Sequence, residues 1–296
     1  MVCEFNGGQK ILRLAIMMTL LTAIFVFIGY VIGLLVGYTE FVTLGALAIA
    51  ALLNVISYFF ADKIVLRMSH AKIVSASDQP ALHRIVSSLA AADNIPTPKV
   101  AVIESKVPNA FATGRGPSNS VVAVTTGLMG VVNDDELEGV LSHELSHVKH
   151  RDVLIASVVA TIAGAISYLA LIGRFGGLYA GSSSRNNNAG IFAIIVSFLA
   201  PFAALLVQTA ISRSREYEAD RGGAMLCRKP LALASALEKI ERTVRNGPTL
   251  NANPSTSSLW IVNPFRGDTI IELFSTHPST WKRIERLKAM AATGMI

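Results

Sequence analysis

Two histidines and a glutamate lie close together in the segment GVLSHELSHVKHRD, which covers residues 139 to 152. His143 and His147 are four residues apart, and Glu144 directly follows the first histidine. On an α-helix, four residues advance about 6 Å along the axis and place both imidazoles on one face. Two imidazoles placed in this way can share one tetrahedral metal ion. The spacing therefore predicts a metal site, provided that the segment is helical.

Glu144 is suited to proton transfer rather than to metal binding. Its carboxylate can accept a proton from a water molecule activated by the metal and pass that proton to a leaving amine. The HExxH pattern that results is typical of zinc peptidases. His150 lies on roughly the same face, but it is about 10.5 Å from His143 along the axis, so a basic residue at an interface is favoured over a third ligand. Cys3 and Cys227 are the only cysteines, which excludes a disulfide framework and a Cys-rich metal site.

A catalytic zinc site needs a third protein ligand and one open position. The candidate lies in the segment SRSREYEADRGGAM, residues 212 to 225, where Glu216 and Asp220 are four residues apart on one predicted helix face. Asp220 could then accept a hydrogen bond from the second nitrogen of a metal-binding histidine. An exposed helix with Arg–Glu salt bridges is the alternative, and these residues alone do not decide between the two.

The helix that must carry the histidines has a clear start. Asn133 and Glu136 have the spacing of a capping box, and acidic residues fill the first turn. An apolar stripe follows, formed by Leu137, Leu141, Leu145 and Val148. Upstream, the segment from Gln79 to Ala92 has helical periodicity, and two β-rich runs follow at Val100–Ile103 and Val121–Thr125. Residues 61–152 are therefore predicted to form a compact α+β unit.

The chain as a whole is too apolar for an ordinary soluble domain. It is 52% hydrophobic and only 16% charged, with a mean hydropathy of +0.50. Four stretches are long and apolar enough to cross a membrane as helices: Ile11–Val36, Phe41–Phe60, Val153–Ile172 and Ile191–Ile211. The first has no small-x-small cleavage pattern, which favours a retained anchor over a signal peptide. The last two form a predicted hairpin that brings residues 212–296 back to the side of the membrane that holds residues 61–152.

Basic residues near the ends of the spans predict the orientation. They all fall on one side: Lys10, Arg13, Lys63, Arg67, Lys72, Lys149, Arg151, Arg213 and Arg215. The opposite side has the turn 37–40, which has no Lys or Arg, and the loop 173–190, which has two Arg. We therefore expect a multi-pass protein of the cell membrane, with both termini and the active site cytosolic. Basic flanks that face anionic lipid explain the net charge of +6. Nucleic acid is not an expected partner, because no aromatic residues alternate with the basic ones.

Several motifs together carry a family resemblance. SHELSHVKHRD is followed by the predicted hairpin and by REYEADRGGA, with VPNAFATG upstream and STHPSTWKRIERL downstream. This order, over nearly the whole chain, resembles the HtpX family of membrane-bound zinc metalloproteases, which is related to the CAAX prenyl-protein endopeptidases. The resemblance implies one zinc ion per chain, bound by His143, His147 and Glu216. It also implies that Glu144 is the general base and that Asp220 accepts a hydrogen bond from a zinc-binding histidine.

The resemblance also implies how a substrate binds. The edge strand of the family corresponds to Asn109, Ala110, Phe111, Ala112 and Gly114, and such an edge can hold an extended peptide by main-chain hydrogen bonds. Ordinary hairpin geometry is the alternative for Asn109 and Gly114. His277 corresponds to a late histidine that stabilises the oxyanion, although Ser279 stands where members often have a second proline. Quality control of damaged or misassembled membrane proteins is the implied role, with membrane proteins or unfolded proteins as substrates.

Two segments near the C-terminus are less specific. Residues 246–268 are rich in Pro, Asn, Ser and Gly, which favours a connector over a mobile cover. The segment Thr280–Met290 predicts a basic amphipathic helix that packs on the catalytic unit. Its basic residues are expected to face lipid headgroups: Lys282, Arg283, Arg286 and Lys288.

Two other kinds of protein also fit part of the pattern. An intramembrane protease would place HExxH inside an apolar span, but charged residues flank the motif here at Asp134, Asp135, Lys149 and Arg151. A membrane scaffold or transporter with a structural metal site would need a closed ligand set. The chain instead offers three ligands and an adjacent base, which favours an endopeptidase. Its oligomeric state is not encoded in any of these patterns.

Overall fold

The computed structural model of the chain describes residues 7–162, 213–247, 259–262 and 279–294. The N-terminal part contains α1 (Gly7–Val36), α2 (Thr39–Met68), β1 (Lys72–Ile73), α3 (Pro80–Ala92), β2 (Lys99–Ile103), β3 (Ala110–Gly116), β4 (Asn119–Thr125), α4 (Thr126–Val131) and α5 (Asp134–Lys149). An apolar helix, Asp152–Ile162, follows α5. The C-terminal part contains α8 (Arg213–Cys227), α9 (Pro230–Asn246) and α11 (Thr280–Ala292).

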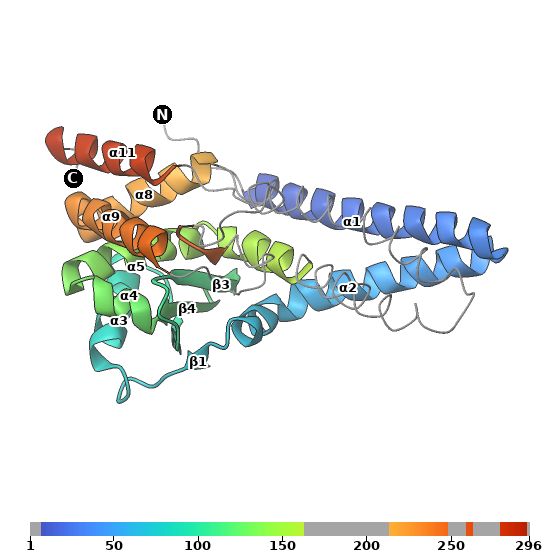
Figure 1. Cartoon of the computed structure of the whole chain (residues 1–296), viewed down its shortest axis with the longest axis horizontal. Helices are drawn as coiled ribbons and strands as arrows, with labels where there is room; N and C mark the ends of the chain where they lie inside the picture. Colours follow the sequence, from blue (N-terminus) through green and yellow to red (C-terminus); the bar gives the residue numbers. More distant parts are fainter. Residues whose placement is uncertain (1–6, 163–212, 248–258, 263–278, 295–296) are drawn as a thin grey trace.

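Helices α1 and α2 form a long antiparallel pair that projects from the rest of the molecule (Figure 1). Both are long and apolar enough to cross a membrane, and only 22% and 17% of their apolar windows are buried. A core helix of a soluble protein would bury most of its apolar surface. The first two predicted spans are therefore candidate membrane helices. The third predicted span is described only as the helix Asp152–Ile162, and the fourth lies outside the described residues.

Small residues allow α1 and α2 to approach closely. A Cβ atom on Gly29 would lie 2.4 Å from Ala46 Cβ, and one on Gly33 would lie 2.5 Å from Thr39 Cα. The amide of Asn54 donates hydrogen bonds to the Thr22 hydroxyl at 2.9 Å and to the Met18 carbonyl at 3.3 Å. Close backbone packing and polar contacts of this kind hold membrane helices together.

The four-stranded sheet has the order β1-β2-β4-β3, which leaves β3 at one edge. Strands β2 and β4 are parallel, and the other neighbouring pairs are antiparallel. The last turns of α2 pack beneath the sheet, where Val65 shares a buried cluster with Phe111 and Ala123. This packing explains why α2 continues to Met68, past the predicted end of the span at Phe60.

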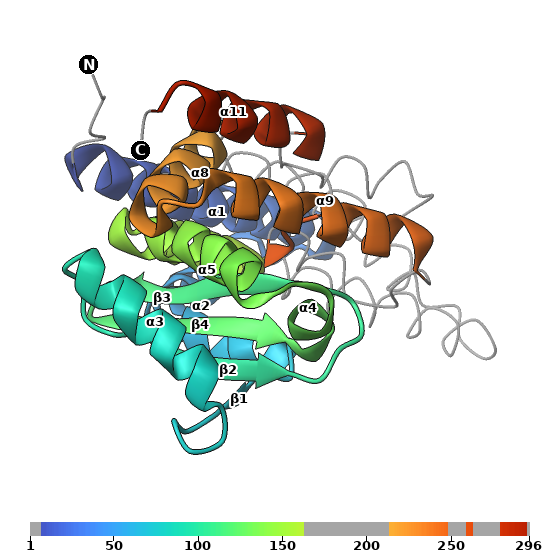
Figure 2. The same cartoon turned by 90° about the vertical axis from the view of Figure 1, so that its left-hand side faces the viewer.

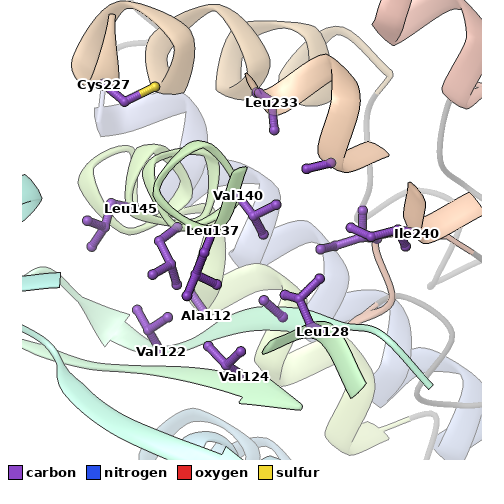
Figure 3. Packing of buried hydrophobic residues seen from close by; sticks show 14 of the residues in the cluster. Ala112, Val122, Val124, Leu128, Leu137, Val140, Leu145, Cys227, Leu233 and Ile240 are labelled. Carbon is purple, nitrogen blue, oxygen red and sulfur yellow. The ribbon is translucent and has the colours of Figure 1, made fainter. Parts of the chain in front are cut away.

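The other face of the sheet carries the main core. Alternate residues of β4, Val122 and Val124, pack with Leu137 and Leu145 of α5 and with Leu233 of α9 (Figure 3). Figure 2 shows α5 lying between the sheet and the layer formed by α8, α9 and α11. The α+β organisation predicted from the sequence is thus present.

The predicted helix start at Asn133 is confirmed. The backbone N–H of Glu136 donates to Asn133 Oδ1 at 2.9 Å, and the N–H of Asn133 donates to Glu136 Oε2 at 2.8 Å. The predicted apolar stripe of α5 is buried. Strand β1 and helices α4 and α9 were not predicted, although α9 has an apolar stripe with helical spacing at Leu233, Leu237, Ile240 and Val244.

Candidate active site

Helix α5 holds the two histidines and the glutamate on the side away from bulk solvent. His143 and Glu144 are buried, and His147 is half-buried. The two imidazole rings are nearly perpendicular, at 89°, with their centroids 4.8 Å apart. The helical spacing that the sequence predicts therefore places both rings next to one candidate metal position.

Helix α8 brings Glu216 to the same point because two glycines let it approach α5. A Cβ atom on Gly223 would lie 2.7 Å from the backbone nitrogen of His143. A Cβ atom on Gly222 would lie 2.6 Å from Ser146 Oγ. Larger residues at these positions would push the helices apart and withdraw Glu216 from the histidines.

His143, His147 and Glu216 have the separations of a metal site. Glu216 Oε2 lies 3.8 Å from His143 Nε2, and Glu216 Oε1 lies 3.5 Å from His147 Nε2. One ligand atom from each of the three residues can be chosen so that all lie within 4.8 Å of one another. In a tetrahedral zinc site, neighbouring ligand atoms are about 3.3 Å apart. The three side chains therefore fit one zinc ion after a small contraction.

The other nitrogen of each imidazole faces a carboxylate. His143 Nδ1 lies 2.9 Å from Asp220 Oδ1, and His147 Nδ1 lies 3.5 Å from Asp152 Oδ2. Such partners fix the orientation of a metal-binding histidine and direct Nε2 to the ion. Asp220 occupies the place that the sequence predicts. Asp152 was missed, although it follows His147 by five residues at the start of an apolar stretch.

The carboxylates around His147 also change its protonation. Burial alone would lower the pKa of His147, but the neighbouring Asp152 and Glu216 raise it to about 10. Without a metal ion this imidazole is therefore protonated on both nitrogens, and positively charged, at neutral pH. A metal cation must replace one of these protons to bind, and the same negative charges attract the cation.

Arg283 is the main correction to the sequence-based expectations. Its side chain was expected to face lipid headgroups, but it is only 1% exposed and pairs with Asp220. Arg283 Nε donates to Asp220 Oδ2 at 2.8 Å, and a terminal nitrogen donates to Asp220 Oδ1 at 2.7 Å. Arg283 lies on the face of α11 that buries Ile284 and Leu287, so packing of the helix draws it inward. Burial would raise the pKa of Asp220, but Arg283 and His143 lower it to about 2, so Asp220 is ionised at neutral pH.

Arg286 and Lys288 of α11, unlike Arg283, are exposed. The guanidinium of Arg286 lies 3.7 Å from the centroid of the Tyr217 ring, which is a cation–π contact. Lys288 donates to Glu238 at 2.8 Å on the exposed surface. Arg286 therefore contacts α8, and Lys288 contacts α9.

Glu144 touches the edge strand. The backbone N–H of Ala112 in β3 donates to Glu144 Oε2 at 3.0 Å. Burial raises the pKa of the Glu144 carboxyl, while His143 and His147 oppose that rise. A carboxylate with a raised pKa accepts a proton more readily at neutral pH, which suits a general base.

The predicted edge segment 109–114 is part of the site wall. Ala110, Phe111 and Ala112 are buried in β3. The Asn109 amide donates to the Leu259 carbonyl at 3.0 Å and accepts from the Ile261 N–H at 3.0 Å, which fastens residues 259–262 to the sheet. Gly114 has a φ of +142°, and a Cβ there would lie 2.1 Å from the Asn119 carbonyl oxygen. Hairpin geometry thus accounts for Gly114. His277 lies outside the described residues.

Comparison with known proteins identifies the family. The family model described as Peptidase family M48 matches residues 76–291. The chain belongs to peptidase family M48. It is 50% identical over 285 residues to a Protease HtpX homolog of Pyrococcus abyssi, covering 95% of this chain and 96% of that protein. A Protease HtpX homolog of Pyrococcus furiosus is 51% identical over 281 residues, with 94% and 95% covered. One of Paraburkholderia phytofirmans is 47% identical, with 95% and 97% covered.

Among solved structures, the crystal structure of S. mikatae Ste24p aligns with 78% of this chain and 55% of that chain. The TM-score is 0.43 and the sequence identity is 19%. The M48 match and the Protease HtpX relatives confirm the family resemblance seen in the motifs. This M48 protein is a membrane metalloprotease, with His143, His147 and Glu216 as a candidate metal-binding group.

Proposed function

We propose that the protein is a zinc-dependent endopeptidase that cleaves membrane proteins, or unfolded proteins near the membrane, at a site just outside the bilayer. The observation that carries this proposal is the convergence of His143, His147 and Glu216 beside the carboxylate of Glu144. Three ligands and an adjacent base match a catalytic zinc site, which keeps one position open. Zinc bound there would supply a Lewis acid that polarises the scissile carbonyl.

The residues of the chain would then divide the work of hydrolysis. Glu144 takes a proton from the attacking water and gives it to the leaving amine. Asp220 and Arg283 keep His143 in place. We propose that an extended substrate lies along β3, pairing with main-chain groups other than the Ala112 N–H, since that N–H already donates to Glu144. His277 is the proposed donor to the oxyanion.

The proposed topology has four spans, with the active site and both termini in the cytosol. The basic flanks of the spans and the position of α2 directly before the sheet support it. The test uses a background that lacks Cys3 and Cys227, with Ser118→Cys or Ser182→Cys added. An impermeant thiol reagent should label position 182 in intact cells and leave position 118 unlabelled. Labelling at 118 without labelling at 182 would refute this orientation. Quality control of damaged membrane proteins is the role that we propose for such an enzyme.

The decisive experiment for the proposed function separates metal binding from proton transfer. Glu144→Gln keeps the size and hydrogen bonding of the side chain but removes the base. We expect the purified variant to retain about one zinc per chain and to lose hydrolysis of casein by on the order of 100-fold or more. Glu216→Ala removes a ligand, so zinc content should fall together with activity.

Glu218→Ala is the matched control for Glu216→Ala, because Glu218 lies on the same turns of α8 but is exposed. Its zinc content and activity should equal those of the wild type. A fully active Glu144→Gln variant would refute the peptidase mechanism. Normal zinc affinity in Glu216→Ala would place the third ligand elsewhere.

A further inference from the structure

The turn after α5 directs a second acidic residue to the metal site. Helix α5 ends at Lys149, and Arg151 has a positive φ of 57°, a left-handed conformation that separates α5 from the next helix. The apolar helix Asp152–Ile162 begins at the next residue. Asp152 therefore stands at the junction between the metal-binding helix and the apolar helix, and its carboxylate faces His147 at 3.5 Å.

We propose that Asp152 is a positioning residue for the metal ligand His147, and that the apolar helix which begins at Asp152 thereby helps to shape the metal site. The inference rests on the zinc site of the proposed function. The side chain of Asp152 is only 12% exposed, so water competes little for the carboxylate. A hydrogen bond from His147 Nδ1 to Asp152 would leave Nε2 as the metal ligand and hold the ring in one orientation.

The contacts of Asp152 parallel those of Asp220. Asp220 lies between His143 and the buried Arg283. Asp152 lies between His147 and Arg215, because its Oδ2 faces the imidazole and its Oδ1 lies 3.3 Å from an Arg215 nitrogen. Arg215 is 7% exposed. Each histidine thus has its own aspartate, and each aspartate has an arginine that compensates its charge in the interior.

Arg215 links Asp152 to helix α8. It directly precedes Glu216, the third residue of the metal-binding group, on α8. Asp152 therefore connects the end of α5 to the start of α8 beside the ligands on both helices. Removing its carboxylate would release His147 and leave the charge of Arg215 without this partner.

A further contact fixes the helix that carries Asp152. The hydroxyls of Ser157 and Thr113 are 2.7 Å apart, and Ser157 Oγ lies 3.5 Å from the Gly114 nitrogen. Ser157 and Thr113 are both fully buried. The apolar helix is thus attached to β3, the strand whose Ala112 N–H donates to Glu144. The contact of Ser157 with Thr113 thus helps to fix the position of the helix that begins at Asp152.

The test measures metal affinity in the full chain, purified in detergent and stripped of metal. Zn²⁺ affinity is determined by competition with a chromophoric chelator, and bound Co²⁺ reports ligand geometry through its visible absorption. Asp152→Ala should raise the zinc dissociation constant by about 10- to 100-fold and alter the Co²⁺ spectrum. Asp152→Asn keeps an oxygen acceptor for His147, so its affinity should lie between those of wild type and Asp152→Ala.

Asp93→Ala is the control. Asp93 has the same side-chain exposure, 12%, and pairs with Lys149 two residues from His147, but it is not among the carboxylates that face His147. Its zinc affinity and Co²⁺ spectrum should match the wild type. If Asp152→Ala does not fold, Asp152→Leu fills the same space without an acceptor and is measured in its place.

The outcomes distinguish this inference from the proposed function. Wild-type zinc affinity and an unchanged Co²⁺ spectrum in a folded Asp152→Ala or Asp152→Leu protein would overturn the role of Asp152. An equal loss of affinity in Asp93→Ala would overturn it as well, because the effect would then reflect only a lost negative charge. Failure of the wild type to bind zinc would refute the zinc site itself and the inference with it.

Discussion

Arg283 and Asp220 form a buried ion pair beside the candidate metal site, and Arg283 also lies 3.6 Å from Glu216 Oε2. Two guanidinium nitrogens contact the two carboxylate oxygens at 2.8 and 2.7 Å. Asp220 also faces His143 Nδ1 at 2.9 Å. Three helices that are far apart in the sequence, α5, α8 and α11, are thus joined by one charged contact in the interior.

The first prediction concerns the stability of this pair. Arg283→Met would leave the Asp220 carboxylate buried without its cation, and breaking a buried pair in this way costs about 3–5 kcal/mol. We expect a loss of this size in the free energy of unfolding of the metal-free protein, measured with denaturant in detergent. Arg286→Met is the control, because Arg286 is exposed and stacks on Tyr217. Equal small losses in both variants would contradict a stabilising role for the buried pair.

Most of the site follows from helical spacing, which acts over a few residues. His143, Glu144 and His147 lie within one and a half turns, and Glu216 and Asp220 are one turn apart, so periodicity alone predicts which side chains share a face. The approach of α8 to α5 depends on Gly222 and Gly223, and helical spacing within α8 does not show which helix these glycines will face.

Arg283 could not be placed by the same reasoning. An amphipathic pattern assigns arginine to the polar face of a helix, and its burial depends on partners on other helices. Asp152 presented a related difficulty, because its neighbours in the sequence are basic residues and an apolar stretch. The length of α2 was underestimated for a further reason. Hydropathy detects the part that is apolar enough for lipid, whereas residues 61–68 are helical because they pack beneath the sheet.

The second prediction tests the contact between the edge strand and the base. Ala112→Pro removes the N–H that donates to Glu144 Oε2, and proline cannot restore it. We expect peptide hydrolysis to fall severely. Zinc content should stay near the wild-type value, because none of the three metal-binding residues lies on this strand. Ala112→Gly keeps the N–H and should retain most of the activity. Normal cleavage by a well-folded Ala112→Pro protein would show that Glu144 does not need this hydrogen bond for catalysis.

The third prediction concerns pH. Burial of Glu136 would raise its pKa, but hydrogen bonds from Lys239, Ser235 and the Asn133 backbone lower it below its ordinary value of 4.5. A group whose pKa is lower in the folded state adds stability above its unfolded pKa and loses that contribution as the pH falls. Wild type should therefore be more stable than Glu136→Gln at pH 7, and the difference should shrink below about pH 4.5.

Glu136→Gln is a suitable comparison because glutamine can still complete the capping box with Asn133. Titration of the other carboxyl groups is common to both proteins and cancels in the difference. Unfolding free energies measured between pH 7 and pH 3 provide the test. A stability difference that does not depend on pH would show that the charge of Glu136 contributes nothing through Lys239.

The fourth prediction concerns the packing of the two membrane helices. Gly29→Ala would place a Cβ atom 2.4 Å from Ala46 Cβ, far inside the contact distance of two carbon atoms. The helices would have to separate or shift, and overpacking of this kind costs about 1–3 kcal/mol. We expect a lower midpoint for thermal unfolding of the detergent-solubilised protein.

The contact partner provides an internal rescue for this variant. Ala46→Gly removes the atom that clashes. The double variant Gly29→Ala/Ala46→Gly should therefore be more stable than the sum of the two single-variant losses predicts. Gly45→Ala is the control for helix propensity, since a Cβ at Gly45 would meet nothing within 4 Å. It should leave the unfolding midpoint unchanged or raise it. If Gly29→Ala behaves like Gly45→Ala, or if Ala46→Gly adds its own loss without rescue, α1 and α2 do not pack through these two residues in the membrane protein.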